Sequence, residues 1–228
     1  LAAAFAATLA VGIFALAGCS SSNTNSDKAS ASGTQTITDM AGRTVEVPAE
    51  AERVIGIGAS SLRMICYMQA ADKVVGVEQS EQQDSVTCAY RHVNHETFSK
   101  LPVIGEGGSK GVTANEEAII DAAPQVIIAN LDKDSADSLQ QKTNIPVVCV
   151  TMSDIVFDQE LYDNITILGK ILGKEDRGEE LIKYMQDTEK DLQDRTANVE
   201  KKTAYAAGVS YRGGHGFSGT EAGFAPFS

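Results

Sequence analysis

The spacing of apolar and polar positions changes several times along this 228-residue chain, and each change predicts a different element. Between Thr36 and Pro48, two short alternating stretches flank Ala41 and Gly42, a pattern typical of a β-hairpin. Five later runs are apolar almost throughout, as the buried strands of a parallel sheet are. These predicted strands are RVIGIG (53–58), KVVGVE (73–78), LPVIG (101–105), PQVIIAN (124–130) and IPVVCV (145–150).

Segments between these runs carry apolar residues three or four positions apart, which predicts helices. The predicted helices cover residues 60–70, 113–122 and 135–142. In the second of them, Ile119 and Ile120 are expected to face inward. Strands that alternate with helices in this way form parallel sheets covered on both faces, so residues 36–157 are predicted to form an α/β lobe.

Residues 158–202 show helical spacing only and are predicted to form a helical connector. A first helix spans 158–172, and a second runs from Glu175 to about Val199, where it would be roughly 35 to 40 Å long. A strand pattern returns at residues 203–211. We therefore expect residues 203–228 to begin a second α/β lobe, in a sequence that is truncated at both ends.

The first 18 residues form an uncharged apolar run and are predicted to be part of a signal peptide. The run ends in Leu16, Ala17, Gly18 and Cys19, which resemble a bacterial lipobox, so Cys19 is expected to carry lipid. An ordinary signal peptide or a single membrane anchor remains the alternative. Residues 19–35 are rich in Ser, Asn and Ala and are predicted to be a flexible tether between membrane and lobe.

Charge and cysteine usage narrow the functional classes. A net charge of -12, without a basic stripe that includes aromatic residues, argues against nucleic-acid binding. Beyond Cys19, the three cysteines show no close pairing. Cys66 and Cys149 lie in apolar runs and are expected to be buried free thiols, whereas Cys88 lies in polar sequence. No disulfide is predicted.

One segment has the outline of a dinucleotide-binding unit, with Gly56 and Gly58 after a strand and Glu78 about twenty residues on. The third glycine is absent, because Ser61 occupies its place. The alternative is that both glycines permit a tight turn from strand to helix. Export also argues against a nicotinamide cofactor, so a nucleotide-dependent enzyme is only a remote alternative. Motifs for a nucleophilic serine or a phosphate loop are absent.

Several segments, taken in order, resemble the type III solute-binding proteins of ABC importers, which deliver ferric siderophores, haem and cobalamin. The matching segments are the lipobox, ITDMAGRTVEVP, ERVIGIGASS, DKVVGVE, LPVIGEGG, ANEEAIIDAAPQVIIAN and LGKILGKEDRGEELIKYMQ. The resemblance implies two α/β lobes joined by a rigid helix, with the ligand held in the cleft between them. It implies a monomeric, lipid-anchored, extracytoplasmic protein that captures an iron(III) chelate and delivers it to an ABC permease, without catalysis or a cofactor.

The site should follow from topology, since ligands of open α/β sheets lie beyond the carboxyl ends of the strands. The cleft residues predicted on this basis are Ser60, Ser61, Glu78, Gly107, Gly108, Asn130, Tyr211, Arg212 and His215. A guanidinium suits the carboxylates or phenolates of a chelate. Alternatively, Arg212 is only solvated and the glycines only turn the chain. The resemblance further implies that Glu117 docks to the permease.

Two alternative ligands stay open. His92 and His95 are three positions apart and, with Tyr211 or His215, could coordinate a metal ion directly, although two histidines in a polar loop are usually exposed bystanders. Molybdate or tungstate could be bound by backbone N–H groups and serines. The resemblance implies that the identity of the ligand depends on the second lobe, most of which is expected to lie beyond this sequence.

Overall fold

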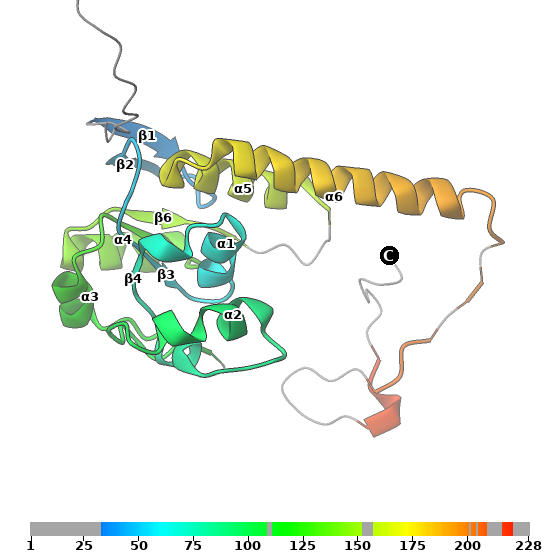
Figure 1. The fold of residues 1–228 in the computed structure, drawn as a ribbon, viewed down its shortest axis with the longest axis horizontal. Helices are drawn as coiled ribbons and strands as arrows, with labels where there is room; N and C mark the ends of the chain where they lie inside the picture. Colours follow the sequence, from blue (N-terminus) through cyan, green and yellow to red (C-terminus); the bar gives the residue numbers. More distant parts are fainter. Residues whose placement is uncertain are drawn as a thin grey trace, which may run out of the picture. The chain divides into compact units, whose positions relative to one another are not determined.

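The computed structural model describes residues 33–108, 111–151, 157–200, 202–203, 205–208 and 216–220 (Figure 1). The strands are β1 (Thr34–Thr38), β2 (Thr44–Pro48), β3 (Val54–Ile57), β4 (Val74–Gly76), β5 (Val126–Ala129) and β6 (Val147–Cys149). The α-helices are α1 (Ser61–Tyr67), α2 (Ala89–Phe98), α3 (Glu116–Ala122), α4 (Lys133–Thr143), α5 (Gln159–Leu172) and α6 (Glu175–Thr196). Short 3-10 turns are η1 (Ala71–Lys73), η2 (Gln79–Gln82) and η4 (Gly216–Ser218).

Strands β3 to β6 form a four-stranded parallel sheet in the order β4-β3-β5-β6, which confirms the predicted α/β lobe. The predicted strand at residues 101–105 is wrong. Only a single bridge from Val103 to Val77 continues the sheet there, and Gly105 bridges Ala114 in the antiparallel sense. Pro102 has no amide hydrogen to donate, so this segment cannot sustain a full ladder.

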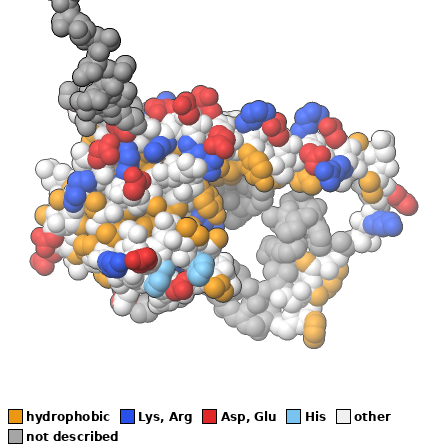
Figure 2. All heavy atoms as spheres, viewed as in Figure 1, with side chains coloured by type: hydrophobic (Ala, Val, Ile, Leu, Met, Phe, Trp, Pro, Cys, Tyr) orange, Lys and Arg blue, Asp and Glu red, His pale blue; other side chains and the backbone are white. Residues whose placement is uncertain are grey.

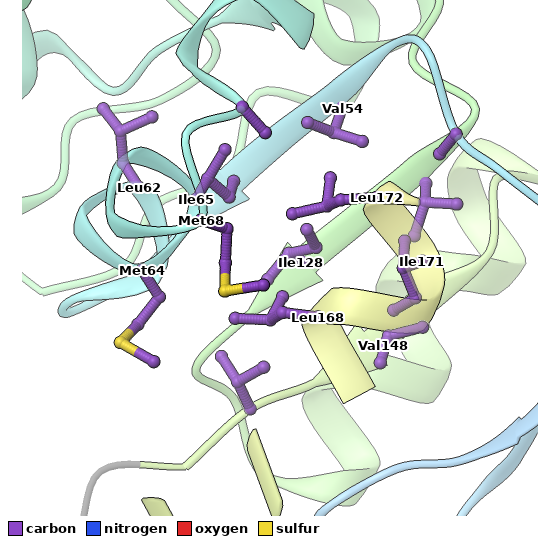
Figure 3. Close-up of a cluster of buried hydrophobic side chains, with 14 of the residues drawn as sticks. Val54, Leu62, Met64, Ile65, Met68, Ile128, Val148, Leu168, Ile171 and Leu172 are labelled. Carbon is purple, nitrogen blue, oxygen red and sulfur yellow. The ribbon is translucent and has the colours of Figure 1, made fainter. Parts of the chain in front are cut away.

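Side chains alternate between the two faces of the sheet along each strand, and a hydrophobic cluster covers each face, so both faces are buried. On one face, Val54 and Ile128 pack with Met68, the C-cap of α1, and with Leu168 and Ile171 of α5 (Figure 3). The opposite face forms a second cluster with α3 and α4. Its buried strand residues are Ile55, Ile57, Ile127, Ala129, Val147 and Cys149. The nearly unbroken apolar runs of the sequence are therefore explained by burial on two sides.

The β1–β2 hairpin was predicted correctly and is fixed to the edge strand β6 through its turn. Met40 N donates to Cys149 O over 3.1 Å, and Cys149 N donates to Asp39 Oδ2 over 3.0 Å. Buried Arg43 donates through Nη1 to Asp39 Oδ2 and to Val147 O, at 3.1 and 2.8 Å. The turn thereby satisfies backbone groups that the edge of the sheet would otherwise leave unpaired.

Helix α5 begins at a cap, since Asp158 accepts a hydrogen bond from Leu161 N, and it ends at Gly173, whose φ is +61°. Helix α6 packs against α5 with its first half and was predicted correctly as a long helix. From Lys190 to the end of α6 every residue is exposed, including Leu192 at 50% exposure. Along the exposed face of α6, Lys and Arg side chains lie beside acidic ones four residues away (Figure 2).

Three expectations need correction. Helix α2 occupies a stretch that was predicted to be a polar loop. It was missed because only Tyr90 and Phe98 anchor it to the core. Ile120 is 48% exposed, so only Ile119 faces inward. The described positions within residues 203–211 form no strand. A strand requires a hydrogen-bonded neighbour, and the described chain after α6 does not supply one.

All three cysteines of the lobe are free thiols, as predicted. Cys149 is buried as expected, whereas Cys66, which was also expected to be buried, is half-buried, as is Cys88. Burial raises the pKa of Cys66 to about 12 and that of Cys149 to about 11. Among the helices of the described ranges, none combines the length and apolar character needed to cross a membrane.

Candidate functional site

The candidate site lies along the carboxyl edge of the parallel sheet, where the strands lead into loops. Residues 58–61 follow β3, and Asn130 follows the neighbouring strand β5. Asn130 ties these two loops together, because its N–H donates to Ile57 O over 2.9 Å and its Nδ2 donates to Ala59 O over 3.2 Å. The structure thus brings Ser60, Ser61 and Asn130 to one edge, as topology predicted.

Gly58 permits a close approach at the centre of this edge. Its φ is +82°, and a Cβ atom built there would lie 2.8 Å from Asn130 O. A Cβ on Gly56 would similarly lie 2.7 Å from Leu62 N. Both glycines therefore serve the turn from β3 into α1 and the packing of that helix, which favours the tight-turn alternative over a pyrophosphate cradle.

Ser61 and Glu78 reach the edge but are used internally. Buried Ser61 Oγ donates to Ile57 O over 2.8 Å. Glu78 is 4% exposed, and its Oε1 accepts a hydrogen bond from Gly58 N over 3.2 Å. Burial raises the pKa of this carboxyl group. Gly107 packs so closely on Glu78 that a Cβ would lie 2.7 Å from its carboxyl carbon. Glu78 therefore holds loops together, which speaks against the predicted ligand role.

Ser60 remains at the edge, in a left-handed conformation with φ at 68°. Its Oγ accepts a 2.6 Å hydrogen bond from Nη2 of Arg63, a residue that the sequence reasoning missed. The Nε of Arg63 is buried and has no partner among the described residues. The sequence did contain a signal for Arg63, because a basic residue in the first turn of a helix interacts unfavourably with the helix dipole. Such a residue suggests a role other than stabilising the helix.

Thr151 follows β6 on the same edge, where the end of that strand was expected, although it was not among the predicted cleft residues. Asn164 of α5 binds both its backbone groups, accepting from Thr151 N and donating to Thr151 O, each over 3.0 Å. Thr151 Oγ1 is buried and has no partner in the described part of the chain. Helix α5 therefore fixes the position of this hydroxyl at the edge.

The histidines predicted to lie in a polar loop lie on helix α2 instead. His92 Nδ1 is 2.8 Å from Asp84 Oδ1, and this contact lowers the pKa of Asp84. His95 Nδ1 is buried, without a partner in the described ranges. Within those ranges, no group of three or more His, Cys, Asp or Glu side chains is arranged to hold a metal ion.

Helix α3 begins with two adjacent glutamates, Glu116 and Glu117, whose surroundings differ. Asn115 caps the helix by accepting a hydrogen bond from Ala118 N. Glu116 forms a 3.0 Å ion pair with Lys142 of α4, which lowers the pKa of Glu116. Glu117 is exposed.

Other predicted residues lie outside the described part of the structure: Cys19, Tyr211, Arg212 and His215. Gly107 and Gly108 lie near the edge with φ values of 67° and 68°. A Cβ on Gly108 would approach Ser80, which follows β4. The described first-lobe site therefore consists of Ser60, Arg63, Asn130 and Thr151.

The chain is 23% identical over 201 residues to a Bacillus subtilis protein described as an uncharacterized ABC transporter substrate-binding lipoprotein, YvrC. The match covers 86% of this chain and 59% of YvrC. The fold is similar to that of the molybdate periplasmic binding protein MolA from Haemophilus influenzae, with 20% identity, a TM-score of 0.58, and coverage of 73% and 55% of the two chains.

The petrobactin-binding protein YclQ from Bacillus subtilis is also similar, with 15% identity, a TM-score of 0.57, and coverage of 75% of this chain and 56% of YclQ. The chain thus spans little more than half the length of these proteins. A family description of periplasmic binding proteins matches residues 54–226, which include the sheet, its carboxyl edge and the long helix α6. The chain therefore belongs to the periplasmic binding protein family.

Proposed function

We propose that this protein captures an iron(III) chelate at the carboxyl edge of its sheet and delivers it to an ABC permease. The match to periplasmic binding proteins over residues 54–226 carries this proposal. The similarity to YvrC, described as an ABC transporter substrate-binding lipoprotein, supports the transport role. Capture and release require no covalent chemistry, in agreement with the absence of a catalytic motif in the sequence.

The chemistry of the edge favours a chelate over a naked cation. Among the described residues, its side chains are a hydroxyl pair, an amide and a guanidinium, in Ser60, Thr151, Asn130 and Arg63. The carboxylate of Glu78 also reaches these loops, but it is turned inward onto Gly58 N. Donor groups of this kind bind oxygen-rich anionic ligands, whereas a bare cation requires carboxylates, imidazoles or thiolates.

The remaining parts of the proposal concern organisation and place in the cell. Lipid on Cys19 and the tether at residues 19–35 would hold the protein outside the cytoplasm, at the membrane that contains its permease. Residues 158–202 would connect the lobe at 36–157 to a second lobe that begins at residue 203. Tyr211, Arg212 and His215 would then face the edge from that second lobe.

Ligand titration tests the proposal. Calorimetry with ferric siderophores, haem and cobalamin should show saturable binding of one of them, and free Zn(II) should bind at least about a hundredfold more weakly. Replacing His92 and His95 by alanine should leave chelate binding unchanged, because neither residue lies in the first-lobe site. Tight Zn(II) binding that these two substitutions abolish would instead establish direct metal capture.

Molybdate is the second candidate ligand, since MolA shares the fold and is described as a molybdate binding protein. Binding of molybdate in the same titration, with no heat from any iron chelate, would favour it.

Delivery is tested at Glu117. Glu117→Gln should lower uptake of the labelled chelate by about tenfold in cells that contain the permease, because a docking carboxylate loses its basic partner. Ligand affinity should not change. Glu116→Gln is the matched control, since it removes the same charge one residue away but from an internal pair with Lys142. Equal uptake by both variants would exclude Glu117 as a docking residue.

A further inference from the structure

Among the described residues, Arg63 is a cation with few hydrogen-bond partners for its donors. Its guanidinium reaches back along α1 to the loop that follows β3, where Nη2 donates to Ser60 Oγ over 2.6 Å. This is a neutral acceptor and a single bond. The Nε–H is buried and has no acceptor among the described residues. A guanidinium offers five N–H donors in a planar fork, so most of this binding capacity is left over.

Every other arginine in the described ranges is bound to a carboxylate or to a backbone carbonyl. Their acceptor residues are Asp39 and Asp137 for Arg43, Ala122 and Ala123 for Arg53, Ser80 for Arg91, Tyr67 and Glu180 for Arg177, and Asp191 for Arg195. These side chains have structural roles that account for their presence. Arg63 differs from them because its one hydrogen-bond partner among the described residues is a hydroxyl group.

The excess of acidic residues in the chain makes it more informative that, among the described residues, Arg63 has no carboxylate partner. The sequence contains 31 Asp and Glu residues against 19 Lys and Arg residues, so carboxylates are plentiful. A half-buried guanidinium without a counter-ion carries a desolvation cost that an anion would offset. Among the described residues, however, no carboxylate pairs with Arg63. The unmet charge therefore fits an anion that comes from outside the chain.

Neighbouring groups on the same edge can extend such an anion site. Thr151 Oγ1 is buried and unpartnered within the described structure, and Asn164 fixes its backbone. Asn130 lies on the strand between those that lead to Ser60 and Thr151, and its amide is already oriented by Ala59 O. All these side chains can donate a hydrogen bond, and an anionic oxygen is the acceptor that they share.

We propose that Arg63 is the first-lobe binding residue for an anionic oxygen group of the ligand, with Ser60 positioning its guanidinium. The chemical class is a carboxylate, a phenolate or a metal oxyanion. The inference rests on the proposed function for the location of the ligand at this edge. It adds that the ligand is negatively charged, and it names the residue that recognises this charge.

The experiment compares the full chain with Arg63→Gln, Arg63→Lys and Lys100→Gln by calorimetry, using ferric citrate, a ferric tris-catecholate and molybdate as probes. Arg63→Gln should weaken binding of the anion that the wild-type chain takes up by about ten- to a hundredfold, the loss expected for hydrogen bonds to a charged group. Arg63→Lys should recover part of that affinity. Lys100→Gln removes the same charge at an exposed position and should change it less than about twofold.

The outcomes separate this inference from the proposed function. Loss of molybdate binding in Arg63→Gln, in a chain that binds no iron chelate, would support Arg63 and refute the chelate. Unchanged affinity for a ferric chelate in Arg63→Gln would support the chelate and refute Arg63. A folded wild-type chain that binds none of the three anions would refute both. Matching circular dichroism spectra and melting temperatures exclude misfolding as the cause of any loss.

Discussion

Arg43→Met is expected to lower the free energy of unfolding by about 3 to 5 kcal/mol, the cost of removing one partner from a buried ion pair. Arg43 is 6% exposed and Asp39 is 4% exposed, so water cannot replace the lost guanidinium. Besides Asp39, the same guanidinium binds Asp137 Oδ1 over 2.7 Å, Val147 O over 2.8 Å and Gln140 Oε1 over 2.9 Å. The substitution would therefore remove the bonds from the hairpin turn to α4 and one of its bonds to β6.

Urea unfolding followed by circular dichroism measures this loss. Lys133→Gln is the matched control, because Lys133 binds the same Asp137 over 2.6 Å at an exposed position, where a salt bridge contributes about 0 to 1 kcal/mol. The double variant Asp39→Asn with Arg43→Met should lose less than the sum of the single losses, since no buried charge is left alone. A loss below about 1 kcal/mol in Arg43→Met would show that the buried pair does not hold the hairpin.

Gly58→Ala is expected to destabilise the lobe by about 2 to 5 kcal/mol, from two separate causes. The left-handed backbone at φ +82° costs a residue with a Cβ about 1 to 2 kcal/mol. The new methyl group would also lie 2.8 Å from Asn130 O and 3.2 Å from Val112 Cγ2, which adds about 1 to 3 kcal/mol of overpacking.

Gly42→Ala isolates the first of these causes. Gly42 has a similar φ of +73°, but nothing lies within 4 Å of a Cβ built there. Its loss in thermal unfolding should therefore correspond to the backbone cost alone. The difference between the two variants measures how closely the loops after β3 and β5 approach. Equal losses would mean that the Asn130 loop moves away freely, and the edge would then not be a rigid binding surface.

Much of the fold could be predicted from the sequence, because strands that are buried on both faces consist almost entirely of apolar residues. Strands β3, β5 and β6 were found as apolar runs, and α5 and α6 as helical spacing. Helix α2 was not found, since its contact with the core depends on Tyr90 and Phe98 alone. A helix with so few buried positions has no clear period, and only its packing beside α1 defines it.

The candidate site, like the fold, could be predicted only in part from the sequence. The rule that ligands lie beyond the carboxyl ends of parallel strands located the edge and correctly placed Ser60, Ser61 and Asn130 there. It could not tell which side chains on that edge are free. Glu78 was selected for its position, yet it binds Gly58 N, twenty residues away in the sequence. Arg63 was overlooked, although its Nε is buried without a partner among the described residues and its guanidinium bonds there only to a hydroxyl group.

By itself, the sequence determined a parallel α/β lobe, a long helix after it and the edge where a ligand would bind. Periodicity and apolar content record these features, because they depend on which residues avoid water. Only the tertiary structure decided which polar groups at that edge are already satisfied. That answer depends on hydrogen bonds such as those from Asn164 to Thr151 and from Gly58 to Glu78, whose partners are set by packing and leave no pattern along the chain.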